Sequence, residues 1–489
     1  MLSWAIGATL CLVTLPILTL EAQPALKTPA AQGVADEPCP PAAIAVEPGA
    51  SIQAAVDLAG DGASFCLKNG VHRMQVIRPK AGQSFSGEGQ SVLNGSRLLT
   101  TFSREGRYWL ASHEQRGRRH GQCAKEAPTC GFPEGFFIDD KPLGRVLSKD
   151  SVEAGRFYLD YANQRLYFAD DPAGRKVEAT VAAVAFQGAA PNVLIRNITI
   201  EKYASLAQEG AIQSRGGTDW TIENCEVRLN SAGGIGVGAG SRVLDCDIHH
   251  NGQIGITGVG PDILIENNRI WANNVRGFAT GWEAGGVKLA LSNGVTFRGN
   301  HVHDNIGAGL WCDINCRNVV YEGNLIERNR NAGIFHEISF HAVIRNNILR
   351  HNDVVHRNWF WGDDILIAAS QDVEVYGNTL TVSAGGCGII LVDQNRSDKS
   401  GGKYKTRNNT VHHNEMTFEG AACAGGVSDA EAGDENYNII TDGNNLFDHN
   451  IYRVPRMSGS PRFVWGHAIF DWDGLRCKGE ESNGQLVIY

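Results

Sequence analysis

The sequence predicts an all-β solenoid, a parallel β-helix in which short strands stack coil upon coil. From about residue 190 onward, alternating strands end repeatedly in polar turns, as in "NVLIRNITI", "ILIENNRI", "VTFRGNHV" and "VVYEGNLI". One position of this repeat forms a column, which contains Cys225, Cys246, Asn268, Asn300, Asn324, Asn347 and Asn378. Most steps in the column are 21 to 24 residues long, which is the length of one coil. The stacked asparagines are expected to bond one another along the column.

The chain is expected to begin with a signal peptide over residues 1–22 and a linker over residues 23–37. Residues 2–20 carry no charge, and a stretch rich in small residues and proline follows them. An uncleaved membrane anchor stays the alternative, because the apolar run is long and no lysine or arginine precedes it. We therefore expect a secreted or periplasmic protein that has no membrane contact after cleavage.

The rest of the chain divides into a cap, an inserted module and the regular coils. Residues 38–98 contain "SIQAAVDLAGDGASFCLKNGVHR", which predicts a capped amphipathic helix and then a strand, closing the end of the solenoid. Residues 99–185 break the coil period, and strands such as "RFYLD" and "RLYFADD" predict a small β-rich module. Residues 186–489 then form the parallel β-helix with a C-terminal extension.

The cysteine content and the net charge indicate which cross-links, metal sites and partners to expect. An oxidising compartment favours disulfides, and 11 cysteines follow the apolar N-terminus. We expect Cys123 to pair with Cys130 and Cys39 with Cys66, and the odd count leaves at least one thiol free. A zinc site is not expected, because no pair of CxxC motifs is present. The net charge of −9 and the lack of a long basic run argue against a nucleic-acid partner.

Two steps of the asparagine column are about nine residues too long. The extra residues lie in "WANNVRGFATGWEAGG" and "VVHRNWFWGDD", and insertions on one side of a solenoid usually build its binding face. The inserted tryptophans Trp282, Trp359 and Trp361 are candidates for stacking on sugar rings, with aromatic cover for a loop as the alternative.

Two acids occupy the same register of neighbouring coils. Asp313 and Glu337 each stand four residues after a glycine, and 24 residues separate them. Because side chains alternate along a strand, Leu310 should face the core and both acids should face outward. Stacked strands lie about 4.8 Å apart, so the carboxylates should lie about 5 Å apart, the separation of the catalytic acids in a retaining glycosidase. Calcium binding and chance stay the alternatives.

Lys288 is expected to face outward one coil before Asp313, where its charge would keep Asp313 ionised. Glu283 lies on the inserted loop just upstream and could pair with Lys288 or bond substrate hydroxyls. A surface salt bridge between the two is the alternative.

Residues 281–348 contain "GWEAGGVKLA", "GLWCD" and "GIFHEIS". They resemble the right-handed parallel β-helix enzymes of glycoside hydrolase family 120, the β-xylosidase family. In that family an E-x-x-G-x-K segment precedes a GLWxD strand with the nucleophilic aspartate, and the next coil carries an F-x-E glutamate as acid/base. The resemblance implies a retaining glycoside hydrolase without a cofactor, in which Asp313 is the nucleophile and Glu337 the acid/base. Family members also insert a small β-rich module before the helix.

The expected partner is a carbohydrate. The substrate-binding candidates around the two acids are Lys288, Glu283, Trp282, Trp311, His336, Trp359, Trp361 and Asp364. One alternative function is a β-helix polysaccharide lyase that uses Lys288 with calcium, and another is a non-catalytic glycan-binding solenoid.

Overall fold

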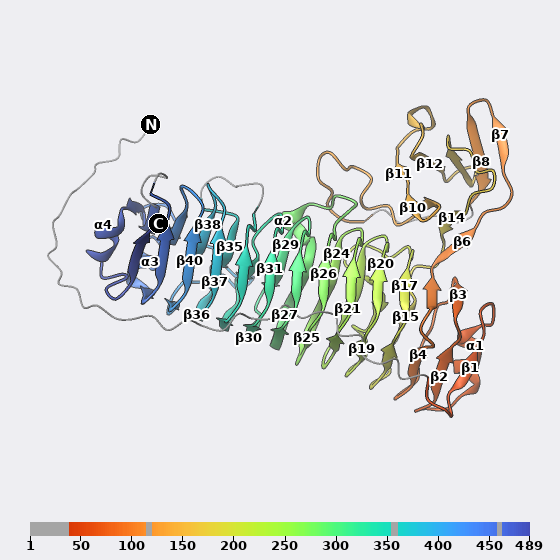
Figure 1. The fold of residues 1–489 in the computed structure, drawn as a ribbon, viewed down its shortest axis with the longest axis horizontal. Coiled ribbons are helices and arrows are strands. Elements are labelled where there is room, and N and C mark those ends of the chain that lie inside the picture. Colours follow the sequence, from red (N-terminus) through yellow and green to blue (C-terminus); the bar gives the residue numbers. More distant parts are fainter. Residues whose placement is uncertain (1–38, 114–119, 354–359, 457–461) are drawn as a thin grey trace.

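The computed structural model describes residues 39–113, 120–353, 360–456 and 462–489. Strands stack along one long axis into a solenoid, and a small β-rich module projects from its side near the N-terminal end (Figure 1). The predicted signal peptide and linker, residues 1–22 and 23–37, lie outside the described residues. No helix among those described is long and apolar enough to cross a membrane.

The first of three parallel sheets carries the two acids of interest. Its neighbouring strands belong to successive coils, so each step along the sheet is one turn of the solenoid. Its strands are β15 (Phe186–Gln187), β18 (Gly210–Gln213), β21 (Gly233–Val237), β24 (Ile254–Pro261), β27 (Gly285–Arg298), β29 (Ala308–Asp313), β32 (Ile334–Glu337), β35 (Asp363–Ala368), β38 (Cys387–Asp393), β41 (Cys423–Ser428) and β44 (Arg462–Gly466).

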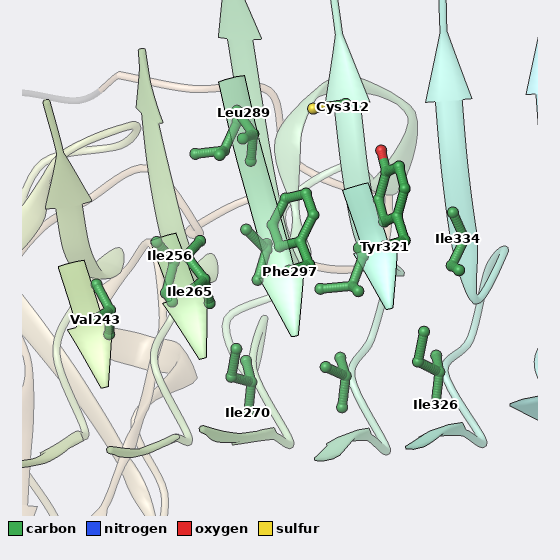
Figure 2. Packing of buried hydrophobic residues seen from close by; sticks show 14 of the residues in the cluster. Val243, Ile256, Ile265, Ile270, Leu289, Phe297, Cys312, Tyr321, Ile326 and Ile334 are labelled. Carbon is green, nitrogen blue, oxygen red and sulfur yellow. The ribbon is translucent and has the colours of Figure 1, made fainter. Parts of the chain in front are cut away.

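The other two sheets complete each coil. The second sheet runs from β1 (Ile44–Val46) to β42 (Leu446–Asp448), and it joins the first sheet through the long strand β27. The third sheet has 13 strands, from β3 (Gly70–Arg73) to β46 (Gln485–Ile488). Figure 2 shows apolar side chains from all three sheets meeting inside the coils, among them Leu289, Phe297 and Ile326. This stacked core is the main source of stability, because each coil buries its apolar face against the next.

The predicted asparagine ladder is confirmed. The side-chain amide of each asparagine donates to the amide oxygen of the next, at 3.0 Å from Asn268 to Asn300 and 2.9 Å from Asn324 to Asn347. The ladder continues past the predicted column through Asn378 to Asn414, at 2.8 Å. A second ladder was not predicted. It runs through Asn230, Asn251, Asn273, Asn305, Asn329 and Asn352.

Both ends of the solenoid are closed. At the N-terminal end, α1 (Ile52–Leu58) buries Ile52 and Val56, and the Ser51 hydroxyl caps it by accepting from the Ala54 amide. The predicted capped helix is therefore confirmed. At the C-terminal end, an antiparallel pair forms between β44 and β45 (Ala468–Phe470), and α4 (Trp472–Arg476) packs beside it. These elements replace the coil that would otherwise pair with the last strands.

The module consists of two small sheets between β5 (Ser91–Asn94) and β15. One contains β6 (Ser96–Leu98), β9 (Phe136–Ile138), β10 (Lys141–Pro142) and β14 (Val177–Thr180). The other contains β7 (Ser103–Glu105), β8 (Tyr108–Ser112), β11 (Gly144–Arg145), β12 (Arg156–Asp160) and β13 (Arg165–Phe168). Its segment from Cys123 to Cys130 contacts the solenoid. There Cys123 forms an isolated antiparallel β-bridge with Phe278, and the Ala124 amide donates to the Gly277 carbonyl. The module therefore supports the loop that precedes β27.

The two predicted disulfides, Cys39–Cys66 and Cys123–Cys130, are present. A third, Cys387–Cys423, was not predicted and joins register partners on β38 and β41. Cys225 and Cys246 are free and buried, as expected for core neighbours in the asparagine column.

Candidate active site

Strands β29 and β32 hold the two acids on one face of neighbouring coils. Leu310 and Cys312 lie in the core, so the intervening side chains of Trp311 and Asp313 point to the other face. Trp311 is paired with Phe335 in the parallel register, which places Asp313 beside Glu337. Adjacent strands lie about 4.8 Å apart, and the two carboxyl groups are therefore neighbours.

The glycines before each acid allow this close stacking. A Cβ atom on Gly309 would lie 2.5 Å from the Gly333 carbonyl oxygen, and one on Gly333 would lie 2.8 Å from the Asp364 carbonyl oxygen. Any larger residue would push the coils apart at this point. The glycine that begins both sequence stretches is thus required by backbone packing rather than by chemistry.

Asp313 is held by one cation and one backbone amide. The Lys288 ammonium lies 2.9 Å from Oδ2, and the Ile314 amide donates to Oδ1 at 2.8 Å. Lys288 also donates to the Trp282 carbonyl at 2.9 Å and lies 3.6 Å from the centre of the Trp311 ring. The predicted contact between Lys288 and Asp313 is therefore present.

Glu337 occupies a different environment. Its Oε1 accepts from Arg396, and its Oε2 accepts from the Trp311 indole nitrogen at 3.2 Å. Burial raises the pKa of Glu337 to about 7, and the neighbouring Asp313 carboxylate adds to this, while Arg396 and Lys288 oppose it. The pair thus combines a salt-bridged aspartate with a buried glutamate whose pKa lies near neutral pH, so that this glutamate can both give and take a proton there.

A cavity of about 410 Å³ opens over both acids. On the side of the preceding coils, Glu283 accepts from the Gln208 amide and from the Thr257 hydroxyl, both at 2.7 Å. Glu283 forms no ion pair with Lys288, so of the two expectations for this residue the salt bridge is wrong and the bonding of substrate hydroxyls stays a prediction. Trp282 lines the rim and packs against Phe278, which the Cys123–Cys130 loop supports. Polar groups beside an aromatic ring are the usual lining of a sugar site.

Sequence reasoning missed Arg396, Arg215, Gln208 and Thr257, which also line the cavity. Arg396 lies on the loop of residues 394–409 between β38 and β39 (Thr410–His412). A signal for this loop exists, because the step from Asn378 to Asn414 in the asparagine ladder is 36 residues long. It is a third overlong coil, one step beyond the predicted column.

Three predicted substrate-binding residues do not reach this cavity. His336 is fully buried, because it alternates with Phe335 and Glu337 and so faces the core, where it contacts the Tyr321 hydroxyl at 3.3 Å. Burial lowers its pKa to about 3. Trp361 lines a separate cavity beside the Cys387–Cys423 disulfide.

Asp364 is the third of these corrections. It ends the second asparagine ladder, where its Oδ1 accepts from the Asn352 side chain at 2.8 Å, and it is 2 % exposed. A buried ladder residue has no face left for a substrate. The remaining candidate, Trp359, lies outside the described residues.

Replacement of Asp364 by asparagine should stabilise the protein at alkaline pH. Burial raises the pKa of Asp364 to about 7, so its ionisation costs stability as the pH rises from about 4 through 7. An asparagine side chain at this position would keep the Oδ1 acceptor without the charge. We expect Asp364→Asn to raise the free energy of unfolding by about 2 kcal/mol at pH 8 and to change it little at pH 4. Thermal melts at both pH values test this, and equal shifts at both would contradict it.

The described residues contain no group of three or more histidine, cysteine, aspartate or glutamate side chains placed to hold a metal ion. The two acids instead face Lys288 and Arg396. Each acid thus has a cationic side chain beside one of its oxygens.

Comparisons with known proteins agree with the fold. The family described as "Right handed beta helix region" matches residues 210–379. A solved structure described as the complex of XylC with xylose has a TM-score of 0.66 at 16% identity, over 90% of this chain and 82% of that chain. The A-module of the mannuronan C-5 epimerase AlgE6 from Azotobacter vinelandii has a TM-score of 0.45 at 14% identity, over 90% of this chain and 94% of that chain. No curated protein sequence matches. The family match and the XylC structure, together with the stacked coils, show that the chain is a right-handed parallel β-helix protein, as its sequence predicted.

Proposed function

We propose that this protein is a secreted glycoside hydrolase that cleaves oligo- or polysaccharides by a retaining mechanism. The observation that carries the proposal is the pair of acids on adjacent coils of one cavity, in which Asp313 is salt-bridged and the pKa of Glu337 is raised to about 7. Three disulfides suit an oxidising compartment. The XylC structure, which shares the fold, is described as holding xylose, and this supports a carbohydrate ligand.

The mechanism assigns one task to each acid. Asp313 attacks the anomeric carbon, and the bond from that carbon to the leaving oxygen breaks as Glu337 gives this oxygen its proton. Glu337, now a carboxylate, takes a proton from water, whose oxygen attacks the anomeric carbon and releases Asp313. Two inversions at the same carbon retain the configuration of the sugar.

The cavity walls supply binding and orientation. Gln208, Thr257 and Glu283 form a hydrogen-bonded set that can bond sugar hydroxyls, and Trp282 offers an apolar ring beside them. The Trp311 indole, which donates to Glu337, fixes the direction of that carboxyl group.

A lyase mechanism suits this site less well. A lyase base needs a free lone pair, whereas the Lys288 ammonium forms an ion pair with Asp313 and donates to the Trp282 carbonyl. The functional test is a panel of nitrophenyl glycosides and natural oligosaccharides, followed by NMR of the first product. We expect hydrolysis with retained configuration. New ultraviolet absorbance from an unsaturated sugar, without hydrolysis, would instead identify a lyase.

Lys288 should support activity without being the base. Lys288→Ala removes the cation beside Asp313, so we expect kcat/KM to fall by about 10- to 100-fold, with measurable turnover left. Lys288→Arg keeps the charge and should recover part of the loss. Complete loss in Lys288→Ala, together with unsaturated product from the wild type, would make Lys288 the base.

The activity should decline above neutral pH. Glu337 must carry a proton for the first step, and its pKa lies at about 7. We therefore expect kcat/KM for natural substrates to be highest below about pH 7 and to fall about tenfold for each unit above it. A profile that stays level to pH 9 would contradict the assignment of Glu337 as the acid.

A further inference from the structure

Arg396 enters the cavity from a firmly held loop, residues 394–409. Tyr404 of this loop is buried against Ile338 and Ala369, and its hydroxyl donates to the Asn315 side chain at 3.2 Å. The first turn of the loop is fixed as well, since Asp393 accepts from the Asn395 and Thr406 amides at 2.9 and 3.0 Å. The backbone under Arg396 is thus fixed, while its side chain is 38 % exposed and lines the cavity.

The charges in the cavity balance only while Glu337 is ionised. The charged side chains that line it are Arg215, Lys288, Arg396, Glu283, Asp313 and Glu337. Lys288 pairs with Asp313, and Arg215 and Glu283 are linked through the Thr257 hydroxyl, at 2.8 and 2.7 Å. Arg396 pairs with Glu337. When Glu337 takes up the proton that catalysis requires, Arg396 is left without its carboxylate.

Arg396 also competes with the reaction. It donates to Glu337 Oε1 while the Trp311 indole occupies Oε2, so both oxygens act as acceptors. A proton donor needs one of these oxygens turned to the leaving group. Among the described residues, the other acceptor of Arg396 is the Gln394 side-chain oxygen at 3.4 Å, which is distant and uncharged. A substrate that brings an acidic acceptor for the Arg396 guanidinium would therefore favour productive binding.

We propose that Arg396 binds a carboxylate of the substrate, on the sugar that leaves, and that the natural substrate is an oligosaccharide containing a uronic acid. This inference rests on the proposed hydrolase function and names its substrate class. A planar guanidinium forms two parallel hydrogen bonds with a carboxylate, which makes it a better partner for an acidic sugar than for a hydroxyl group.

The arrangement of the cavity indicates where the leaving sugar binds. The set that can bond sugar hydroxyls, Gln208, Thr257 and Glu283, lies on the coils before Asp313. Arg396 contacts Glu337 from the opposite direction along the solenoid, because its loop follows β38 and so belongs to a later coil. The acid/base stands beside the bond that breaks. The sugar that becomes bonded to Asp313 therefore lies on the side of Gln208, Thr257 and Glu283, and the leaving sugar lies on the side of Arg396.

Three substrates with the same non-reducing sugar and linkage test this inference. They are an activated aryl glycoside, a neutral disaccharide, and the same disaccharide with a uronic acid as its leaving sugar. We expect wild-type kcat/KM to be about 30-fold or more higher for the acidic disaccharide than for the neutral one. Arg396→Gln should lose about 100-fold on the acidic disaccharide, chiefly through KM, and less than about threefold on the aryl glycoside. Arg396→Lys should restore part of the loss.

Lys399→Gln is the matched control, because it removes an exposed positive charge from the same loop and should change none of these values. The pH profile gives a second readout. Glu337 faces Asp313 on β29, Lys288 on β27 and Arg396, and loss of Arg396 removes an effect that lowers its pKa. In Arg396→Gln, the alkaline limb for the neutral disaccharide should therefore move to higher pH.

The outcomes separate the two proposals. Equal wild-type rates on both disaccharides, or an equal loss on all three substrates in Arg396→Gln, would overturn the role of Arg396 while the hydrolase function stands. If no aryl glycoside or disaccharide of any sugar is hydrolysed, the proposed function fails and this inference fails with it.

Discussion

Replacement of Asp313 by glycine should reduce hydrolysis of every substrate by about 10⁴-fold or more, or at least about 5.5 kcal/mol of transition-state stabilisation. Without the carboxylate no glycosyl-enzyme intermediate forms, and the remaining groups only bind and polarise the sugar. The space vacated beside Lys288 can admit a small anion. Azide should therefore restore part of the turnover of an activated aryl glycoside and give a glycosyl azide of inverted configuration, which NMR identifies.

A matched variant separates this chemical effect from a folding effect. Asp313 and Lys288 are both buried, and a buried cation without its partner destabilises a protein. Asp313→Asn keeps the size of the side chain and one oxygen, which can accept from either the Lys288 ammonium or the Ile314 amide, yet it cannot attack the anomeric carbon. We expect this variant to melt at a higher temperature than Asp313→Gly, because it leaves no cavity and keeps one polar partner, and to be as inactive as Asp313→Gly. Substantial activity in Asp313→Asn would exclude Asp313 as the nucleophile.

Replacement of Glu337 by alanine should separate substrates by their leaving groups. Natural linkages need the proton that Glu337 donates, so their cleavage should fall by about 10³- to 10⁴-fold. An activated aryl glycoside needs no such proton in the first step and should still give a burst of nitrophenol. The second step lacks its base, so the intermediate accumulates and the steady rate stays low.

The stability of Glu337→Ala gives an independent check. Burial raises the pKa of Glu337 above its pKa in the unfolded chain. Ionisation of Glu337 therefore lowers the free energy of unfolding as the pH rises from about 4 to about 7. Loss of this side chain should therefore not lower the melting temperature at pH 8 by more than a few degrees. Equal losses on natural and activated substrates would show that Glu337 does not act as the acid.

The sequence was sufficient for the features that repeat. Alternation along the strand places Leu310 in the core and Asp313 on the opposite face, and a constant coil length puts Glu337 beside it. The same rule excludes His336, which stands next to Glu337 and therefore faces inward. The asparagine column extends in the structure through Asn414, because every coil repeats the same turn.

The features that the sequence did not predict depend on contacts between distant segments. Arg396 lies 59 residues after Glu337, and only the fold of its loop brings the two together. Asp364 follows an inserted segment that contains two tryptophans, a context typical of a binding site, yet the turn of the chain places it at the end of a ladder. The burial of Asp313 and Glu337 also depends on loops, since both acids face away from the core and are nonetheless buried.

Trapping of the covalent intermediate tests the central claim most directly. A 2-deoxy-2-fluoro glycoside with an activated leaving group forms the intermediate faster than water releases it, so the sugar stays on the nucleophile. The sugar is chosen from the nitrophenyl panel, and the labelled protein is digested and sequenced by mass spectrometry. We predict a single labelled peptide with the sugar on Asp313. A label on another residue, or an unlabelled protein whose hydrolysis product has inverted configuration, would contradict the retaining mechanism built on Asp313 and Glu337.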